Sequence, residues 1–194
     1  MTRSIVAVIR FVAALSALAT ALDSLIRNQR RGAPPEPHRM LVVIDAPIDD
    51  VWAIASDIER QPVWMRDMRR VTMLTEGPIG VGSRGLATVR MLGIGVTDPV
   101  TITERQPPTR FAIRHEGRWA GGGVITLEGG VDGTTTVVRW DETLRAPFLP
   151  DLASVLQAPV FRAVFQADLV RLKRLVETGS ADGPESPLDR LLVA

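Results

Sequence analysis

The spacing of apolar positions changes along the chain and predicts three kinds of element. Residues 4–22 are apolar apart from Arg10 and three small hydroxyl residues, which predicts one helix near the N-terminus. Apolar and polar residues then alternate along six segments, a pattern typical of half-buried strands: 68–76, 84–91, 96–105, 109–116, 119–128 and 134–144. Towards the C-terminus apolar side chains recur three and four positions apart, which predicts one long helix over 151–177.

A strand and two short helices are predicted ahead of the alternating region. Residues 40–46 are rich in β-formers, and Pro47 follows at a position typical of a helix start. Asp57 is expected to cap a second short helix, which Pro62 should end. Because short turns rather than helices join the later strands, the pattern favours an antiparallel meander and an α+β fold.

Three features predict local irregularity. Pro99 has no backbone N–H to donate, which predicts a sheet edge or a bulge in its strand. The glycine run 121–123 predicts a sharp bend or a bulge. Pro159 predicts that the long helix kinks there or begins its main part there.

The N-terminal apolar segment has three interpretations. As a helix, residues 4–22 span about 28 Å, close to the hydrocarbon core of a bilayer. The leading interpretation is a membrane anchor, and four arginines after it would then hold the main domain on the cytoplasmic side: Arg27, Arg30, Arg31 and Arg39. The second is a signal peptide with its cleavage site at residues 17–19 or 19–21, after which the domain would be exported. The third is a helix packed on its own domain or lying flat in a membrane interface.

These patterns divide the chain into four regions. Residues 1–26 form the apolar helix, and 27–39 form a linker that is rich in proline and arginine. Residues 40–177 form one globular domain. Residues 178–194 lack regular periodicity, which predicts a flexible tail.

Composition excludes several classes of function but does not identify one. The net charge is +1 (23 Lys and Arg against 22 Asp and Glu), whereas a nucleic-acid-binding domain usually carries a basic patch. The chain has no cysteine, which excludes disulfides, thiolate catalysis and cysteine metal sites. Its two histidines, His38 and His115, are too few for a multi-histidine metal site. We therefore expect no metal, no cofactor and no nucleic acid.

An ordered set of short motifs resembles a known family. The motifs are Ala46-Pro47-x-x-x-Val51-Trp52, Ser56-Asp57-x-Glu59-x-x-Pro62-x-Trp64, Gly80-x-Gly82, Val137-Val138-Arg139-Trp140 and Phe165-x-x-Asp168-Leu169-x-x-Leu172-Lys173. Over residues 40–177 they resemble the polyketide cyclase/dehydrase branch of the START-related lipid-transfer superfamily (SRPBCC proteins), which has the helix-grip fold. The resemblance implies a curved seven-stranded antiparallel sheet wrapped around the long C-terminal helix and an apolar cavity. Members bind or transfer hydrophobic ligands, and some cyclise polyketides; the family has no universal catalytic residue.

Candidate residues follow from the alternation and the helical stripe. Large apolar side chains and one histidine are expected to line the cavity: Trp64, Phe111, Ile113, His115, Val138, Trp140, Phe161, Phe165 and Leu169. His115 and Glu142 are the candidate acid/base residues because both fall on the more apolar face of their strands. A structural role is the alternative for each, and Asp168 is expected to face solvent. Residues 80–85 match G-x-G-x-x-G, but strands on both sides favour a hairpin loop over a nucleotide site.

Three functions are open at this point. The leading hypothesis is a membrane-tethered START-like domain that binds a lipid or another hydrophobic small molecule, with the membrane contacted through residues 4–22. The alternative is a polyketide cyclase or aromatase that uses His115 or Glu142. The third is an interaction module whose core is filled. The first two differ in whether His115 and Glu142 point into a void.

Overall fold

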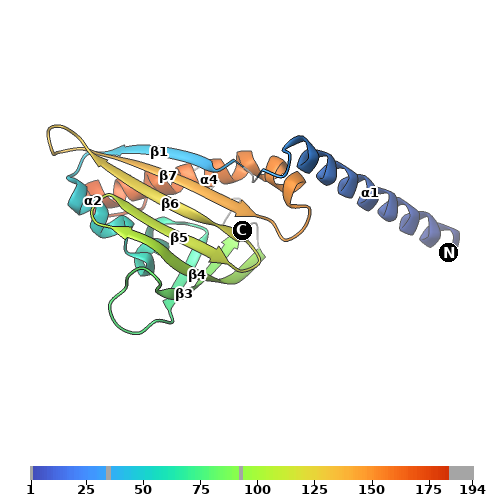
Figure 1. The fold of residues 1–194 in the computed structure, drawn as a ribbon, viewed down its shortest axis with the longest axis horizontal. Helices are drawn as coiled ribbons and strands as arrows, with labels where there is room; N and C mark the ends of the chain where they lie inside the picture. Colours follow the sequence, from blue (N-terminus) through green and yellow to red (C-terminus); the bar gives the residue numbers. More distant parts are fainter. Residues whose placement is uncertain (1, 34–35, 92–93, 184–194) are drawn as a thin grey trace.

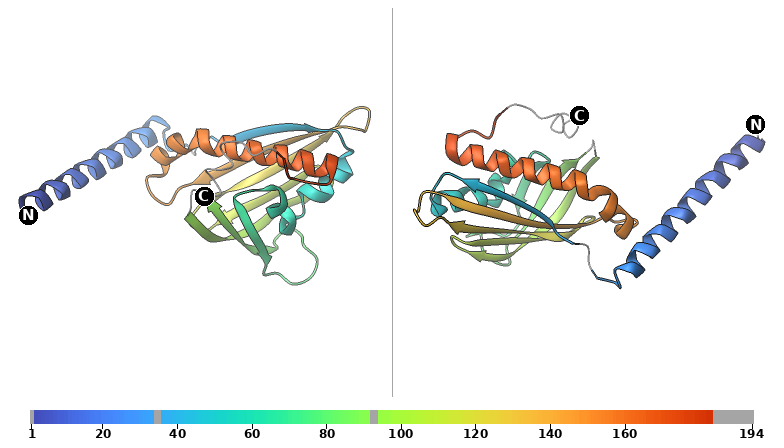
Figure 2. Two further views of the ribbon diagram at one scale, coloured as in Figure 1. Left: turned by 180° about the vertical axis from the view of Figure 1, so that it is seen from behind. Right: turned by 90° about the horizontal axis from the view of Figure 1, so that it is seen from above.

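One antiparallel sheet and one long helix form the body of the protein (Figure 1). The computed structural model describes residues 2–33, 36–91 and 94–183. The sheet has seven strands in the order β1-β7-β6-β5-β4-β3-β2. Their bounds are β1 His38–Ile44, β2 Met68–Met73, β3 Arg84–Met91, β4 Ile94–Gln106, β5 Arg110–Glu116, β6 Ala120–Gly129 and β7 Thr136–Arg145. Helix α4 (Pro150–Thr178) runs along one face of the curved sheet (Figure 2).

The predicted meander and the predicted fold class are confirmed. Each strand from β2 to β6 pairs with the next strand in the sequence. Strand β1 pairs with β7 and forms the edge of the sheet opposite to β2. One register pair of β1 and β7, His38 with Glu142, brings the start of β1 beside the candidate acid/base residue. Inward side chains of the strands and of α4 form the core, in which Ile44, Leu127 and Leu172 are almost fully buried. Apolar burial on one face of a sheet and one stripe of a helix is the main stabilisation of such a fold.

Two short helices and a 3-10 turn follow β1 and cover one end of the sheet. Helix α2 spans Ile48–Ala55, and the turn at Ile58–Arg60 leads directly into α3, Gln61–Trp64. Asp57 caps this turn as predicted, since its carboxylate accepts the backbone N–H of Arg60 at 3.3 Å. The prediction for Pro62 was wrong: it lies in the first turn of α3, where a missing N–H costs no helical bond.

Glycine and proline produce fewer distortions than their positions suggest. Residues 121–123 pair in unbroken register with both β5 and β7, so no bulge occurs there. The bulge of β4 lies between Ile102 and Glu104 rather than at Pro99. Pro99 pairs with Leu86 of β3 and lies just beyond the last β4–β5 pair, where its missing N–H is tolerated. Helix α4 begins at Pro150, so Pro159 lies in its interior and the main part of the helix does not begin there. Residues 80–85 fall between β2 and β3 or at the start of β3, which agrees with a hairpin loop.

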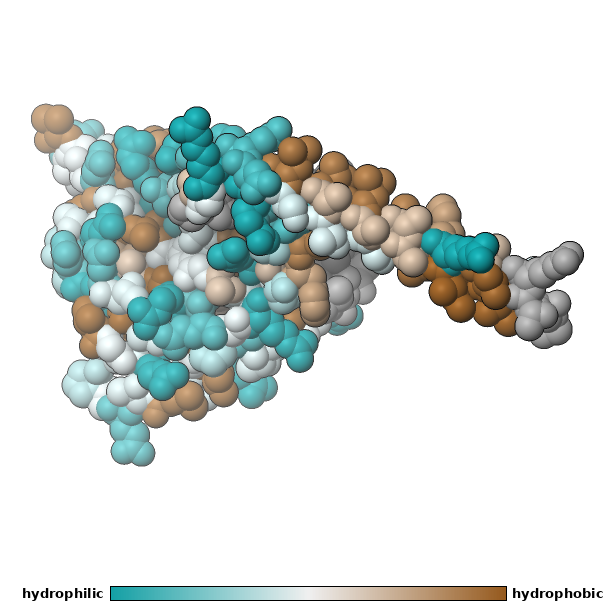
Figure 3. Space-filling model, turned by 45° about the vertical axis from the view of Figure 1, so that its right-hand side comes forward, coloured by the Kyte–Doolittle hydropathy of each residue, from teal (hydrophilic) through white to brown (hydrophobic). Residues whose placement is uncertain are grey.

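The N-terminal helix projects from one end of the body. Helix α1 spans Thr2–Gln29, three residues further than the predicted apolar helix. Side chains at positions 4–18 are exposed, and Figure 3 shows mainly apolar surface along the projecting part. For residues 4–18 this contradicts the interpretation of a helix packed on its own domain. The helix is long and apolar enough to cross a membrane by length and composition, as an anchor or a signal sequence would be.

The C-terminal part of α1 is held firmly against the start of α4. Asp23 is buried, and its carboxylate accepts the backbone N–H groups of Asp151 (2.9 Å) and Leu152 (3.0 Å). Arg27 bridges Asp23 (2.9 Å) and Asp151 (3.0 Å), and Arg30 donates to Ser154 (2.9 Å). The residue at the N-cap position of α4 makes no side-chain cap, so Asp23 satisfies donors that the helix itself leaves unpaired. We call these contacts the α1–α4 clamp.

Candidate functional site

A cavity of about 440 Å³ lies between the sheet and α4. Its size is typical of small-molecule sites. Strands β3 to β7, the segment around α3 and the first half of α4 contribute to its wall. The space that a filled core would occupy is therefore open in the described structure, which contradicts the hypothesis of an interaction module with a filled core.

Most of the cavity wall is apolar, and aromatic rings form a large part of it. The rings of Trp140 and Phe165 lie 5.0 Å apart between centroids, and those of Trp119 and Phe161 lie 5.8 Å apart. Aliphatic side chains of the strands complete the apolar wall, among them Val89, Val100 and Ile125. Burial of an apolar molecule among these groups is favourable because it removes apolar surface from water.

The structure places the predicted cavity residues in two groups. Six line the cavity: Phe111, Ile113, His115, Trp140, Phe161 and Phe165. The other three lie in the packed core behind the wall and are fully buried: Trp64, Val138 and Leu169. They share the inward face of their elements, but the space they point to is filled by other side chains.

His115 and Glu142 meet on the cavity wall. His115 Nε2 and Glu142 Oε1 are joined by a hydrogen bond of 3.1 Å, and the Trp140 indole N–H donates to Glu142 Oε2 at 2.9 Å. Strands β5, β6 and β7 are adjacent in the sheet, and Gly123 of β6 lies between the two side chains in register with Glu142. Without a side chain at position 123, the Glu142 carboxylate lies over the middle strand and reaches His115. Both candidate acid/base residues therefore face a void.

The charge of Glu142 favours the protonated form of His115. Burial lowers the pKa of His115, but the hydrogen bond and negative charge of Glu142 outweigh it. The carboxylates of Asp98 and Asp67 act in the same direction, so the pKa of His115 lies above the ordinary value of a histidine. The carboxylate thus favours a proton on the imidazole, next to the cavity.

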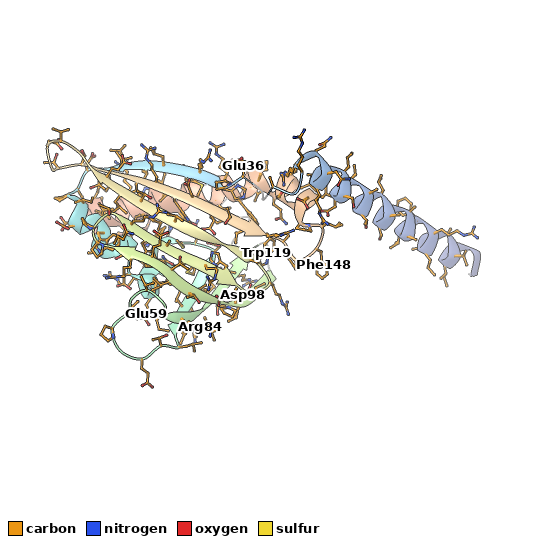
Figure 4. All side chains as sticks on the ribbon, viewed as in Figure 1. Glu36, Glu59, Arg84, Asp98, Trp119 and Phe148 are labelled. Atoms are coloured by element: carbon orange, nitrogen blue, oxygen red, sulfur yellow. The ribbon has the colours of Figure 1, made fainter. Side chains whose placement is uncertain are left out.

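Two further carboxyl groups on the wall escaped the sequence analysis. Asp67 is buried in the short connection between α3 and β2, and Asp98 lies in β4. Burial, and then the charge of Glu142, raises the pKa of Asp67 to about 6. Asp98 accepts the backbone N–H of Trp119 at 3.2 Å. Figure 4 shows Asp98 and Trp119 close together near the end of the sheet. Asp98 alternates with Val96 and Val100, so the period of two could have placed it on the inward face of its strand. Asp67 lies in a short connection and carries no such signal.

Two amides add to the polar part of the wall: Gln61 of α3, which is buried, and Gln157 of α4, which is half-buried. Gln61 of α3 is 1% exposed and lines the cavity. Its side-chain oxygen Oε1 has no hydrogen-bond partner within the described residues. A buried acceptor without a partner costs free energy, which a donor on a bound molecule would recover.

Asp168 corrects another expectation. It was expected to face solvent but is 1% exposed, and it accepts the backbone N–H of Arg66 at 3.0 Å. It lies in α4 and does not line the cavity, so its carboxylate ties α4 to the connection that carries Asp67.

The cavity opens at the end of the body from which α1 projects. Leu156 and Val160 of α4 line the cavity and are also exposed, which places them at its mouth. Phe148, in the loop between β7 and α4, is 82% exposed near the base of α1 (Figure 4). The clamp joins α1 to the turn of α4 that precedes Leu156, so the mouth and the apolar helix occupy the same end of the molecule (Figure 1).

No cluster in the described part of the chain has three or more side chains of the types that hold a metal ion. The arrangement offers an apolar cavity, a histidine–carboxylate pair and buried hydrogen-bond acceptors instead.

Comparison with known proteins gives the family. The family model for polyketide cyclase/dehydrase and lipid transport proteins matches residues 39–177. The chain belongs to this family. The match covers the sheet and almost all of α4, so the polyketide cyclase/dehydrase family assignment extends over the whole cavity and leaves α1 outside.

Solved structures agree with the fold of this polyketide cyclase/dehydrase family member. A Deinococcus radiodurans protein is 24% identical, with a TM-score of 0.54, over 73% of this chain and 96% of its own. A Thermus thermophilus protein is 19% identical, with a TM-score of 0.60, over 74% and 99%. The di-domain ARO/CYC BexL from the BE-7585A biosynthetic pathway is 18% identical, with a TM-score of 0.59, over 73% and 46%. Comparison with curated proteins finds no match.

Proposed function

We propose that the protein binds a hydrophobic small molecule, such as a lipid, in the cavity between the sheet and α4 while α1 tethers it to a membrane. The observation that carries the proposal is the cavity itself: it is apolar, of ligand size and open at one end. A structural core would be closely packed at this place. Membership of a family that includes lipid transport proteins supports the proposal.

The membrane tether is supported by the exposure of α1. An exposed helix with an apolar span from Ser4 is unfavourable in water and favourable in a bilayer. The arginines after it support a cytoplasmic domain, although Arg27 and Arg30 are also engaged in the α1–α4 clamp. A tether at the end that carries the cavity mouth would keep the mouth close to a reservoir of apolar molecules.

The ligand can be tested with two tryptophan variants of α4. Val160 and Val170 have almost equal exposure, 38% and 36%, but only Val160 lines the cavity. The full chain would be extracted with its surrounding membrane in polymer-bounded nanodiscs, and bound compounds would be identified by mass spectrometry of solvent extracts. We expect one class of hydrophobic compound to be enriched over the bulk membrane with the unaltered chain and with Val170→Trp, and lost with Val160→Trp. Equal enrichment with all three proteins, or none with any, would contradict the proposal.

A cyclase or aromatase is the second candidate function, because His115 and Glu142 form a hydrogen-bonded pair on the cavity wall. Such a pair can enolise a ketone, the first step of an aldol-type ring closure: the imidazolium donates a proton to the ketone oxygen, and the carboxylate removes a proton from the neighbouring carbon. The probe is 2-acetonaphthone in deuterated water, whose methyl protons exchange when the ketone enolises. An enzyme of this class should accelerate the exchange and lose the acceleration on His115→Asn. Exchange at the rate of buffer with nanodiscs alone would argue for binding without catalysis.

A further inference from the structure

The ionisable side chains on the cavity wall are mostly of one sign. Three carboxyl groups and one imidazole line the cavity: Asp67, Asp98, Glu142 and His115. No arginine or lysine of the described residues contributes to the wall, although the chain carries 23 basic residues. The arginines of the strands, such as Arg114 and Arg139, lie on the opposite, exposed face of the sheet.

The imidazole neutralises only one of the carboxylates. His115 is paired with Glu142 at 3.1 Å, and the same carboxylate also receives the Trp140 indole N–H. Asp67 and Asp98 have no ion pair with a basic side chain in the described ranges. Whether His115 is protonated or neutral, the wall therefore carries net negative charge when both aspartates are ionised.

Two uncharged amides also line the wall, Gln61 of α3 and Gln157 of α4, and the more deeply buried of them, Gln61, offers a free hydrogen-bond acceptor. The Gln61 side-chain oxygen has no partner within the described residues and is shielded from water. The Gln61 oxygen and the carboxylate oxygens of Asp67 and Asp98 therefore present hydrogen-bond acceptors to a bound ligand. A ligand that brings an O–H or N–H group would satisfy Gln61, whereas an ether or ester end would leave it unpaired.

On these observations we propose that the cavity selects ligands with an apolar body and a neutral or cationic polar end that donates a hydrogen bond, and that it rejects lipid anions such as carboxylates and phosphates. This inference rests on the proposed function and specifies its ligand class. The physical reason is repulsion: in a poorly solvated cavity a ligand anion meets Asp67 and Asp98 without a compensating cation. A cationic ligand gains from the same charges, and a neutral alcohol is unaffected by them.

Three probes with one apolar body test this selection. 2-Naphthylmethanol, 2-naphthylmethylamine and 2-naphthoate are neutral, cationic and anionic near neutral pH. Their binding to the full chain in phosphatidylcholine nanodiscs would be measured by equilibrium dialysis and corrected with empty nanodiscs. We expect the alcohol and the amine to bind and the naphthoate to bind about tenfold more weakly or worse.

Two substitutions separate charge from shape. Asp67→Asn keeps the size of the side chain and removes a charge, so it should strengthen naphthoate binding and weaken amine binding. Asp141→Asn is the matched control, because Asp141 precedes Glu142 in β7 but is exposed and does not line the cavity. Asp141→Asn should change neither naphthoate binding nor amine binding. Gln61→Leu should weaken binding of the alcohol by about threefold to tenfold, the worth of one hydrogen bond.

The outcomes distinguish the two proposals. Naphthoate binding as tight as that of the alcohol, with Asp67→Asn without effect, would overturn the ligand class and leave a hydrophobic binding protein. Absence of binding of all three probes would overturn the proposed function and this inference with it. Binding of all three that Val160→Trp does not reduce would place the probes outside the cavity and would likewise overturn both.

Discussion

At the scale of single residues, the polar cluster depends on a position without a side chain. A Cβ atom at Gly123 would collide with Glu142 Oε2 and lie 3.2 Å from Trp140 Nε1. The neighbouring glycines also allow close backbone contact, since a Cβ at Gly122 would lie 2.6 Å from the carbonyl oxygen of Ile113. Gly123 thus makes room for side chains that cross the sheet, in a run of glycines for which a sharp bend or a bulge is predicted.

Asp67 makes stability depend on pH in a predictable direction. Its pKa is about 6 in the folded protein against an ordinary value of 3.8, so the folded state holds the proton more tightly. The contribution of Asp67 to the free energy of unfolding is therefore complete below about pH 4 and is lost as the pH rises through about 6. Asp67→Asn should remove a pH-dependent contribution on the order of 2–3 kcal/mol.

The measurement is denaturant unfolding of the full chain, followed by tryptophan fluorescence at several pH values. The raised pKa of His115 gives a pH dependence of the same sign, so the variant should keep a weaker slope. Asp141→Asn provides the control. A difference between Asp67→Asn and the unaltered chain that is constant with pH would contradict the assignment.

At the scale of elements, the order and type of every strand could be predicted from the sequence, because alternation shows which residues face inward. Alternation does not show how well the inward space is filled. Neither does the stripe of a helix. This is why Val138 of β7 and Leu169 of α4 were expected in the cavity wall although they lie in the packed core, as does Trp64 of α3. Asp67 and Gln61 were missed because a single polar residue in a short connection or in a helix of four residues carries no periodic signal.

The α1–α4 clamp gives an element-scale prediction. Asp23→Ala removes the acceptor for the backbone N–H groups of Asp151 and Leu152. We expect the free energy of unfolding to fall by about 0.5–2 kcal/mol, as for other helix caps, and these two amides to exchange hydrogen faster.

Asp49→Ala is the matched control, since Asp49 lies exposed in the first turn of α2. It should leave exchange in α4 unchanged. If the backbone amides of Asp151 and Leu152 exchanged hydrogen at the same rate in the Asp23→Ala variant, water would replace the carboxylate without loss of stability at the start of α4. That result would contradict the prediction.

At the scale of the whole molecule, α1 and the cavity mouth lie at one end, and the β6–β7 hairpin lies at the other (Figure 1). The proposed function therefore predicts an orientation: the loop that carries Phe148 contacts the bilayer, and the hairpin that carries Val131 stays in water. Both side chains are highly exposed. The cysteine-free sequence allows a single label at either position.

Phe148→Cys and Val131→Cys would be labelled with an environment-sensitive fluorophore in the full chain and reconstituted into vesicles of phosphatidylcholine and phosphatidylglycerol. We expect blue-shifted emission and quenching by lipid-attached quenchers at position 148 only. Emission typical of water at both positions would contradict the orientation.

The position of Asp23 has a consequence for the processing of the protein. Both candidate cleavage sites for a signal peptidase, at residues 17–19 and 19–21, precede it. A mature chain that starts at Thr20 or Leu22 would retain the carboxylate that caps α4, together with Arg27 and Arg30. The last two turns of α1 are thus built as part of the body rather than as part of a leader. Proteolysis would release the apolar segment and leave the fold and its cavity mouth intact.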